Sequence, residues 1–214
     1  MIKIIHIITG LGCGGAENML YKLLKHSDKE KYYHEVISLM DEGVMGDKIR
    51  NEGVIVHTLN ISKANLISSL FEVKKICKDF DIVNTWLYHA DFIGFIISKI
   101  LLKKKLIWNV RHSNLRKQDN KRSTLTLIKI NAFLSKRVDL ITYNSNEALK
   151  NHGNIGYTNK DSRVIYNGFD LGEFKFDEIA REQIRKELGI NNETKVLITV
   201  GRWYLQKDYP TLIE

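Results

Sequence analysis

The chain has 214 residues, a hydrophobic content of 43% and a formal net charge of +8. This composition excludes a disordered segment and leaves room for one full domain and part of a second. Its two cysteines, Cys13 and Cys77, are too few for a disulfide-stapled secreted domain and fit a reducing cytoplasm. The apolar N-terminus is too short for a signal peptide, and residues 92–102 are too short to cross a bilayer, so we expect neither a leader nor a transmembrane segment.

Short apolar runs alternate with helical stretches over the first 170 residues. The β-branched and apolar runs predict strands at 2–8, 34–39, 54–59, 82–86, 106–110, 140–143 and 164–166. Apolar residues at helical spacing predict helices at about 16–28, 64–79, 89–103, 120–137 and 145–153. This β–α order predicts an α/β fold, a Rossmann-like parallel sheet with helices on both faces and ligands at the carboxyl ends of its strands.

The pattern changes after Asp170. A charged helix is predicted at 177–188, a new strand at 195–201, and another helix from Pro210 onward. We therefore expect three parts: an N-terminal Rossmann-like domain over 1–170, a linker with a charged helix over 171–193, and the start of a second domain over 194–214.

The glycine-rich turn over residues 10–15 is the most informative segment for function. It separates the first predicted strand from a helix that opens at Ala16. Glycines let the backbone N–H groups of a helix N-terminus approach an anion, which predicts a phosphorylated ligand. The same glycine spacing matches the dinucleotide fingerprint, with Asp41 near the place of a ribose-binding acid. A nucleotide-dependent reductase or epimerase therefore stays open, as does a turn in which the glycines have only a structural role.

Positive charge is concentrated over residues 103–137, which hold eleven Lys and Arg against one acid, Asp119. Such a surface suits phosphates, anionic lipid or nucleic acid, unless it is simply a solvated helix face. Aromatic side chains are few in this segment, and nucleic-acid platforms need more of them, so we expect no nucleic-acid partner. No histidine pair has metal-ligand spacing, and the two cysteines are far apart, so we also expect no metal site.

Two further pairs of residues carry candidate binding chemistry at strand ends. Arg111 and His112 follow the strand predicted at 106–110 and suit a phosphate or a sugar hydroxyl. Arg202 and Lys207 follow the strand predicted at 195–201 and suit a diphosphate. Each pair alone is also compatible with a solvated surface turn.

Taken together, six ordered segments resemble the family 4 (group 1) glycosyltransferases of the GT-B fold. They are residues 14–17, 86–91, 108–113, 144–148, 164–170 and 200–208. The resemblance implies the N-terminal half of a GT-B fold, in which an acceptor-side domain faces a donor-binding domain across a cleft. It implies retaining transfer of a hexosyl or N-acetylhexosaminyl unit from a nucleotide-diphosphate-sugar to a polysaccharide or lipid-linked glycan of the cell envelope. It implies no cofactor and no metal.

The resemblance also implies roles for single residues. Gly14 and Gly15 would let the backbone approach the donor diphosphate, and Arg202 and Lys207 would neutralise charge on the departing diphosphate. His112 would be the catalytic residue, in contact with the transferred sugar or the phosphate.

Acceptor binding is assigned by the same resemblance to Glu17 and Arg111. Because many relatives act on membrane-linked acceptors, we expect Lys103, Lys104 and Lys105 to face an anionic membrane. The protein would then be cytoplasmic and peripheral at the inner face of the cell membrane.

The sequence stops at Glu214, ahead of the paired glutamates with which the family's C-terminal domain fixes the donor sugar. We therefore expect little sugar transfer by this polypeptide alone. Two interpretations stay open: the N-terminal part of a longer glycosyltransferase, and a non-catalytic subunit that recruits acceptor or membrane. The second would dock a separate C-terminal domain partner through residues 195–214. Tight NAD(P) binding would instead favour the reductase or epimerase.

Overall fold

The computed structural model describes residues 1–115, 121–201, 203 and 207–213. The chain divides into two compact units, Met1–Asn167 and Gly168–Glu214. The first unit ends three residues before the predicted end of the N-terminal domain. Each unit is described below by itself.

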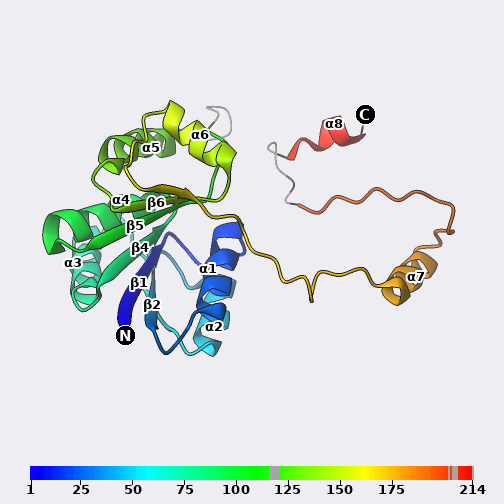
Figure 1. The fold of residues 1–214 in the computed structure, drawn as a ribbon, viewed down its shortest axis with the longest axis horizontal. Helices are drawn as coiled ribbons and strands as arrows, with labels where there is room; N and C mark the ends of the chain where they lie inside the picture. Colours follow the sequence, from blue (N-terminus) through cyan, green and yellow to red (C-terminus); the bar gives the residue numbers. More distant parts are fainter. Residues whose placement is uncertain (116–120, 202, 204–206, 214) are drawn as a thin grey trace. The chain divides into compact units, whose positions relative to one another are not determined.

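Unit 1 is built on a seven-stranded sheet in the order β3-β2-β1-β4-β5-β6-β7, and every neighbouring pair of strands is parallel (Figure 1). The strands are β1 (Ile2–Ile8), β2 (Tyr32–Ser38), β3 (Ile55–Thr58), β4 (Ile82–Trp86), β5 (Lys105–Val110), β6 (Leu140–Tyr143) and β7 (Ser162–Val164). The strand order reverses between β1 and β4, which is where parallel sheets of this kind bind ligands. The predicted α/β fold with a Rossmann-like parallel sheet is confirmed.

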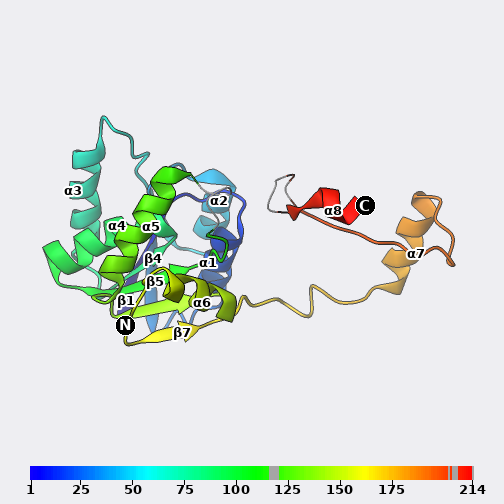
Figure 2. The same cartoon turned by 90° about the horizontal axis from the view of Figure 1, so that it is seen from above.

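Helices cover both faces of the sheet (Figures 1 and 2). One face carries α1 (Gly15–His26) and α2 (Gly43–Asn51). The other face carries α3 (Leu66–Cys77), α4 (Tyr88–Phe95), the π-helix η1 (Ile96–Leu102), α5 (Arg122–Ser135) and α6 (Asn146–Asn154). Because successive strand residues point to opposite faces, β1 supplies both cores. Ile5 and Ile7 join the larger core, whereas Ile8 joins the core under α1 and α2.

Two parts of unit 1 differ from the sequence prediction. The helix α2 was not predicted, because it is short, holds two glycines and buries few large apolar side chains, Met45 and Ile49. The helix predicted at 89–103 is α-helical only as far as Phe95 and continues as the π-helix η1. Lys103 ends it in the left-handed conformation, with φ 53°.

Unit 2 confirms the charged helix predicted at 177–188 and corrects the strand predicted at 195–201. The helix is α7 (Glu178–Glu187), and the carboxylate of Asp177 caps it by accepting from the Ala180 N–H at 2.9 Å. Residues 195–200 form no strand, and Leu197 is 94% exposed. A strand needs a neighbour for its backbone hydrogen bonds, and the described residues of unit 2 supply α7 and α8 (Tyr209–Ile213) but no strand.

Across the described residues, none of the helices combines the length and the apolar character that spanning a membrane requires.

We expect Gly94→Ala to destabilise unit 1, because a Cβ at Gly94 would overlap the Cγ2 of Thr85 where α4 packs on β4. Thr85 cannot turn away freely, since its hydroxyl donates to Asp91 Oδ1 at 2.5 Å. The overlap should cost about 1–3 kcal/mol, more than the gain of about 1 kcal/mol in helix propensity. Urea unfolding measures the difference.

The matched control is Gly153→Ala in α6, where a Cβ meets no atom within 4 Å. This variant should be as stable as the wild type or slightly more stable. Equal stability of Gly94→Ala and Gly153→Ala would show that the approach of α4 to β4 is not tight.

Candidate functional site

The glycine loop after β1 is open on one side and closed on the other. Gly14 is the N-cap residue of α1, and the amides of the first turn have no carbonyl partner within the helix. A Cβ at Gly12 or at Gly15 would meet no atom within 4 Å, whereas a Cβ at Gly14 would overlap the carboxylate of Glu17. A ligand can therefore approach the backbone at Gly15, and Glu17 lies beside Gly14 at the same helix end.

The loop is held by the connection that follows β2. The Met45 N–H donates to the carbonyl oxygen of Leu11 at 3.0 Å. Gly43 has φ +52°, and a Cβ there would overlap the same carbonyl group, so only glycine fits this close approach. Asp41 lies in this connection and is exposed.

Arg111 extends from the end of β5 across the carboxyl end of β4. Its guanidinium lies 4.8 Å from the centre of the buried Trp86 ring and donates to Asn167 Oδ1 at 3.0 Å. Among the described residues, its buried Nε has no hydrogen-bond partner. Burial lowers the pKa of Arg111. A half-buried cation with a spare donor is suited to hold an anion at this edge.

A row of polar side chains supports Arg111 from the sheet. Asn109 Nδ2 donates to Asn84 Oδ1 on β4 and to the Thr85 carbonyl oxygen, the latter at 3.0 Å. Asn109 Oδ1 accepts from the Thr142 hydroxyl on β6 at 2.8 Å and lies 3.5 Å from a terminal nitrogen of Arg111. The amide of Asn109 is thereby fixed in orientation, with its oxygen toward the arginine.

A chain of hydrogen bonds fixes the indole ring of Trp86 within the fold. The indole Nε1–H donates to His6 Nδ1 at 3.3 Å. Because indole is a donor only, His6 Nδ1 accepts and His6 Nε2 carries the proton, which it donates to His34 Nδ1 at 3.0 Å. His34 Nε2–H then donates to the hydroxyl of Ser27 at 2.7 Å. Both rings must be neutral for this chain to form, and burial lowers the pKa of His6 to about 3, with a further contribution from His34.

His112 lies on the other side of the β5 end, near α6. There the fully buried His152 bonds the Tyr88 hydroxyl through Nε2 at 2.9 Å and the Ala148 carbonyl oxygen through Nδ1 at 2.8 Å. Burial lowers the pKa of His152 to about 4, the bond to Ala148 opposes this shift, and the charge of His112 adds to it. Asp91 is also fully buried, and burial raises its pKa well above the ordinary value although the Thr85 hydroxyl opposes the shift.

The structure brings together some of the predicted site residues and separates others. Gly14, Gly15 and Glu17 share one helix end. Arg111 and His112 follow β5, whereas Lys103 and Lys104 precede it and Lys105 is its first residue, at the opposite edge of the sheet. Lys103 and Lys105 are exposed, and Lys104 Nζ donates to the Lys78 carbonyl oxygen at 2.8 Å. Lys207 lies in unit 2, just before α8, and Arg202 lies outside the described residues.

Sequence reasoning missed the residues that support the site. His6, His34 and Ser27 have no motif, because their partners are distant in sequence. The available signal was His6 itself, a polar residue within an otherwise apolar run in β1.

Comparison with known families decides what kind of protein carries this geometry. The model of Glycosyltransferase Family 4 matches residues 13–173, three quarters of the chain. The chain belongs to this family. The match starts inside the glycine loop and ends beyond β7, so it includes every residue of unit 1 discussed above except those of β1 and Leu11 and Gly12 of the loop. The resemblance stated from sequence is confirmed.

Individual relatives agree with the family assignment. The chain is 23% identical to the capsular polysaccharide biosynthesis glycosyltransferase CapH of Staphylococcus aureus, over 100% of this chain and 61% of CapH. Its fold matches HepE of Anabaena, solved in complex with UDP, with a TM-score of 0.73 and 20% identity over 88% of this chain and 50% of HepE. A glycosyltransferase of Rickettsia africae matches with a TM-score of 0.67 and 14% identity over 90% of this chain and 51% of that one. The chain thus spans only about half to three fifths of these relatives.

The two neutral buried histidines make the free energy of unfolding depend on pH. In the unfolded chain each ring takes up a proton near pH 6.5, whereas in the folded chain the pKa of His6 is about 3 and that of His152 about 4. Their contribution is present above pH 6.5 and is lost as the pH falls toward 4. Between pH 6 and 5 we expect the free energy of unfolding to drop by about 1.4 kcal/mol per pH unit for each histidine.

Urea unfolding at several pH values measures this slope. His152→Gln should lower it by about 1.4 kcal/mol per pH unit, the share of one histidine, and His26→Gln, which changes an exposed histidine, is the control for the loss of a ring. A free energy of unfolding that stays constant between pH 6 and 5 would contradict the neutral chain from Trp86 to Ser27.

Proposed function

We propose that the protein provides the acceptor-side half of a glycosyltransferase that acts on a nucleotide-diphosphate-sugar. In this proposal a hexosyl or N-acetylhexosaminyl unit is transferred, with retention at the anomeric carbon, to a polysaccharide or lipid-linked glycan of the cell envelope. No metal and no cofactor take part. The observation that carries the proposal is the match of Glycosyltransferase Family 4 to residues 13–173, around a glycine loop that is open beside Gly15.

The relatives support the substrate classes. HepE was solved with UDP-glucose, and CapH is named for capsular polysaccharide biosynthesis. A nucleotide-sugar donor and a glycan acceptor are therefore the substrates that we propose for the complete enzyme.

The loop and the nearby cations would stabilise the phosphates. At the start of α1, backbone N–H groups and the helix dipole favour an anion, and the empty space beside Gly15 allows an oxygen to approach them. Arg111, which we assign to the acceptor together with Glu17, also adds a cation at this edge, with an orientation set by Trp86 and Asn167. We assign Lys207 and Arg202 to the charge that grows on the departing diphosphate, the role that a metal ion has in other folds.

His112 and Glu17 are the proposed contacts to the sugars. His112 would touch the transferred sugar or its phosphate from the end of β5 and is the proposed catalytic residue. The Glu17 carboxylate, folded over Gly14, would accept hydrogen bonds from acceptor hydroxyls. We propose little transfer by the 214 residues alone, because a donor-binding domain, in the same or in a separate chain, has to complete the cleft. If that domain is separate, this chain is a recruiting subunit.

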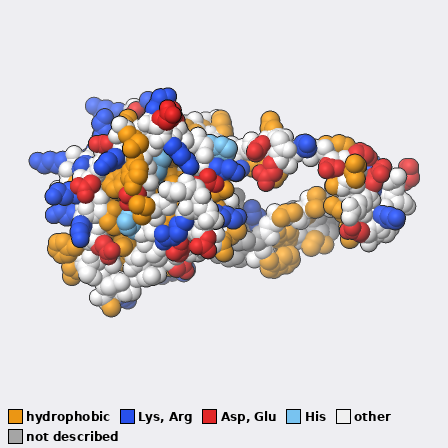
Figure 3. Space-filling view, turned by 90° about the horizontal axis from the view of Figure 1, so that it is seen from below, with side chains coloured by type: hydrophobic (Ala, Val, Ile, Leu, Met, Phe, Trp, Pro, Cys, Tyr) orange, Lys and Arg blue, Asp and Glu red, His pale blue; other side chains and the backbone are white. Residues whose placement is uncertain are grey.

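A second element of the proposal is contact with an anionic membrane on the cytoplasmic side. Exposed Lys103 directly follows η1 and exposed Lys105 begins β5, close in sequence to Ile100 and Leu101 of η1, which are 61% and 48% exposed. Figure 3 shows basic side chains gathered at the left end of that view, beside apolar ones. Exposed aliphatic side chains next to lysines are the combination that binds the interface of anionic bilayers.

We expect Gly15→Ala to weaken the binding of UDP-glucose at least about tenfold, because the added methyl group occupies the space in which a phosphate would approach. The free energy of unfolding should change by no more than about 1 kcal/mol, since that methyl group meets no protein atom. Amide NMR spectra of the chain, titrated with UDP-glucose, measure the affinity and show whether residues 14–17 respond. Gly153→Ala is the matched control.

Equal affinity of Gly15→Ala and wild type would remove the loop from the donor site. Tighter binding of NADP than of UDP-glucose would overturn the glycosyltransferase proposal in favour of the reductase or epimerase.

The membrane contact predicts that Lys103→Ser with Lys105→Ser lowers binding to anionic vesicles about 30-fold, at about 1 kcal/mol for each lysine. Sedimentation with phosphatidylserine-containing vesicles measures this. Lys150→Ser with Lys160→Ser removes the same charge from exposed positions elsewhere and should have a smaller effect. If the variant with Lys103→Ser and Lys105→Ser sediments with the vesicles like the wild type, these two lysines do not form the membrane contact.

A further inference from the structure

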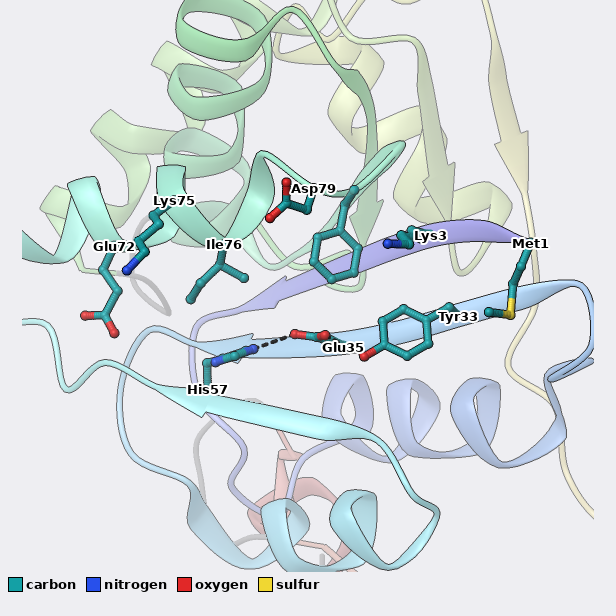
Figure 4. A pocket seen from close by; sticks show the side chains of 10 residues that line it. Met1, Lys3, Tyr33, Glu35, His57, Glu72, Lys75, Ile76 and Asp79 are labelled. Atoms are coloured by element: carbon teal, nitrogen blue, oxygen red, sulfur yellow. Dashed lines mark hydrogen bonds and ion pairs between the residues drawn. The ribbon is translucent and has the colours of Figure 1, made fainter.

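A second hollow lies away from the glycine loop, between α3 and the strands β1 to β3 (Figure 4). Its volume is about 620 Å³, the size of a pocket for a small molecule. On β1 and β2 it is lined from the amino-terminal end to the middle of the strands, by Met1 just before β1, Lys3, Tyr33 and Glu35. Glu35 precedes the loop beyond β2 by four residues, about 13 Å along an extended strand. The hollow is therefore separate from the proposed transfer site.

Polar side chains line this hollow on a sheet face that is otherwise apolar. Glu35 accepts from the Tyr33 hydroxyl at 2.7 Å and from His57 Nε2 at 2.6 Å. Its side chain is only 13% exposed, whereas Ile37, two residues further along the same face of β2, is fully buried in the core. Burying a carboxylate is costly unless it is paired, and an apolar side chain would stabilise this face more. Tyr33 and His57 pair the Glu35 carboxylate within the fold, and this polar cluster lies beside the hollow, where its remaining lone pairs are available to a ligand.

The floor of the hollow is aromatic and apolar. The rings of Tyr33 and Phe80 are stacked, with centroids 6.2 Å apart and planes 21° apart. Ile76 of α3 packs beside them and is partly buried. The Tyr33 ring, held in place by the buried Phe80, suits the apolar face of a ring-shaped ligand, while the polar cluster supplies hydrogen bonds at its side.

The rim carries charges of both signs. Lys3 and Lys75 provide ammonium groups, and Glu72 and Asp79 provide carboxylates. Within the described residues, none of these four side chains makes a hydrogen bond or an ion pair. With Glu35, three carboxylates and two ammonium groups surround the space, so neither an anion nor a cation is strongly favoured. Numerous donors and acceptors with little net charge match a neutral ligand that is rich in hydroxyl groups.

We propose that this hollow is a saccharide-binding site for one or two neutral sugar rings. A sugar ring would lie on the half-buried Tyr33, whose ring stacks on the buried Phe80, with its hydroxyls donating to Glu35, Glu72 and Asp79 and accepting from Lys3 and Lys75. The site concerns binding alone and goes beyond the proposed transfer of sugar at the other edge of the sheet. In a protein that extends a glycan, it would hold a distant part of the chain being extended.

The test is a titration of the 214-residue chain with neutral disaccharides, namely cellobiose, maltose and N,N′-diacetylchitobiose, followed by amide NMR. We expect at least one disaccharide to shift the amides of residues 33–35 and 72–80, with a Kd of about 1 mM. Glu72→Ala and Lys75→Ala should each raise this Kd about fivefold through the loss of one hydrogen bond. Neither side chain has a partner within the described residues, so the fold should be unaffected.

Lys78→Ala changes an exposed residue directly after α3 that does not line the hollow, and should leave the Kd unchanged. Gly15→Ala should also leave the Kd for the disaccharide unchanged. The saccharide site is therefore tested independently of the glycosyltransferase proposal. The inference is overturned if no disaccharide, at concentrations well above 1 mM, shifts the amide resonances of residues 33–35 and 72–80. It is also overturned if both variants bind like the wild type, or if glucose 6-phosphate binds more tightly than every neutral sugar.

Discussion

The site at the carboxyl edge of the sheet depends on the single hydrogen-bond donor of Trp86. Because indole can only donate, this N–H sets the direction of the bonds that follow, through His6 and His34 to Ser27. A face of the same ring carries the guanidinium of Arg111. One buried side chain therefore connects the interior under α1 with the cation that faces the proposed ligand, and each group in the series has one orientation available to it.

The two edges of the sheet have different chemistry. The carboxyl edge has the glycine loop, the start of α1 and Arg111, a cation that has no carboxylate partner in the part of the chain that the structure describes; together they favour phosphate. The amino edge has the exposed lysines before β5 and the hollow beside α3, where charges are balanced and a carboxylate is paired within the fold. Parallel strands produce this separation, because all of them end at the same edge and leave the other to the connecting turns.

The sequence was sufficient for the sheet and for the glycine loop, because both are local patterns. A buried strand is a short apolar run, and glycines at a strand–helix junction are visible as such. The helix α2 was not predicted because it is short and contains two glycines, so its apolar residues show no clear helical spacing. The spacing of apolar residues predicts a helix over the segment of η1 but does not distinguish a π-helix from an α-helix. Residues 195–201 have the apolar sequence of a strand, but a strand forms only where a neighbouring strand pairs with its backbone. The bonds from Trp86 to His6 and from His6 to His34 join residues 80 and 28 positions apart, so no sequence pattern could show them.

The contact between Gly43 and Leu11 has a consequence for how quickly and how tightly a ligand could bind. The Met45 amide and the glycine backbone hold the loop in place through contacts within the fold. The loop is preorganised, so an incoming phosphate would not have to order it, and little conformational entropy would be lost on association. Association would then be limited by diffusion and orientation rather than by a slow rearrangement of the loop.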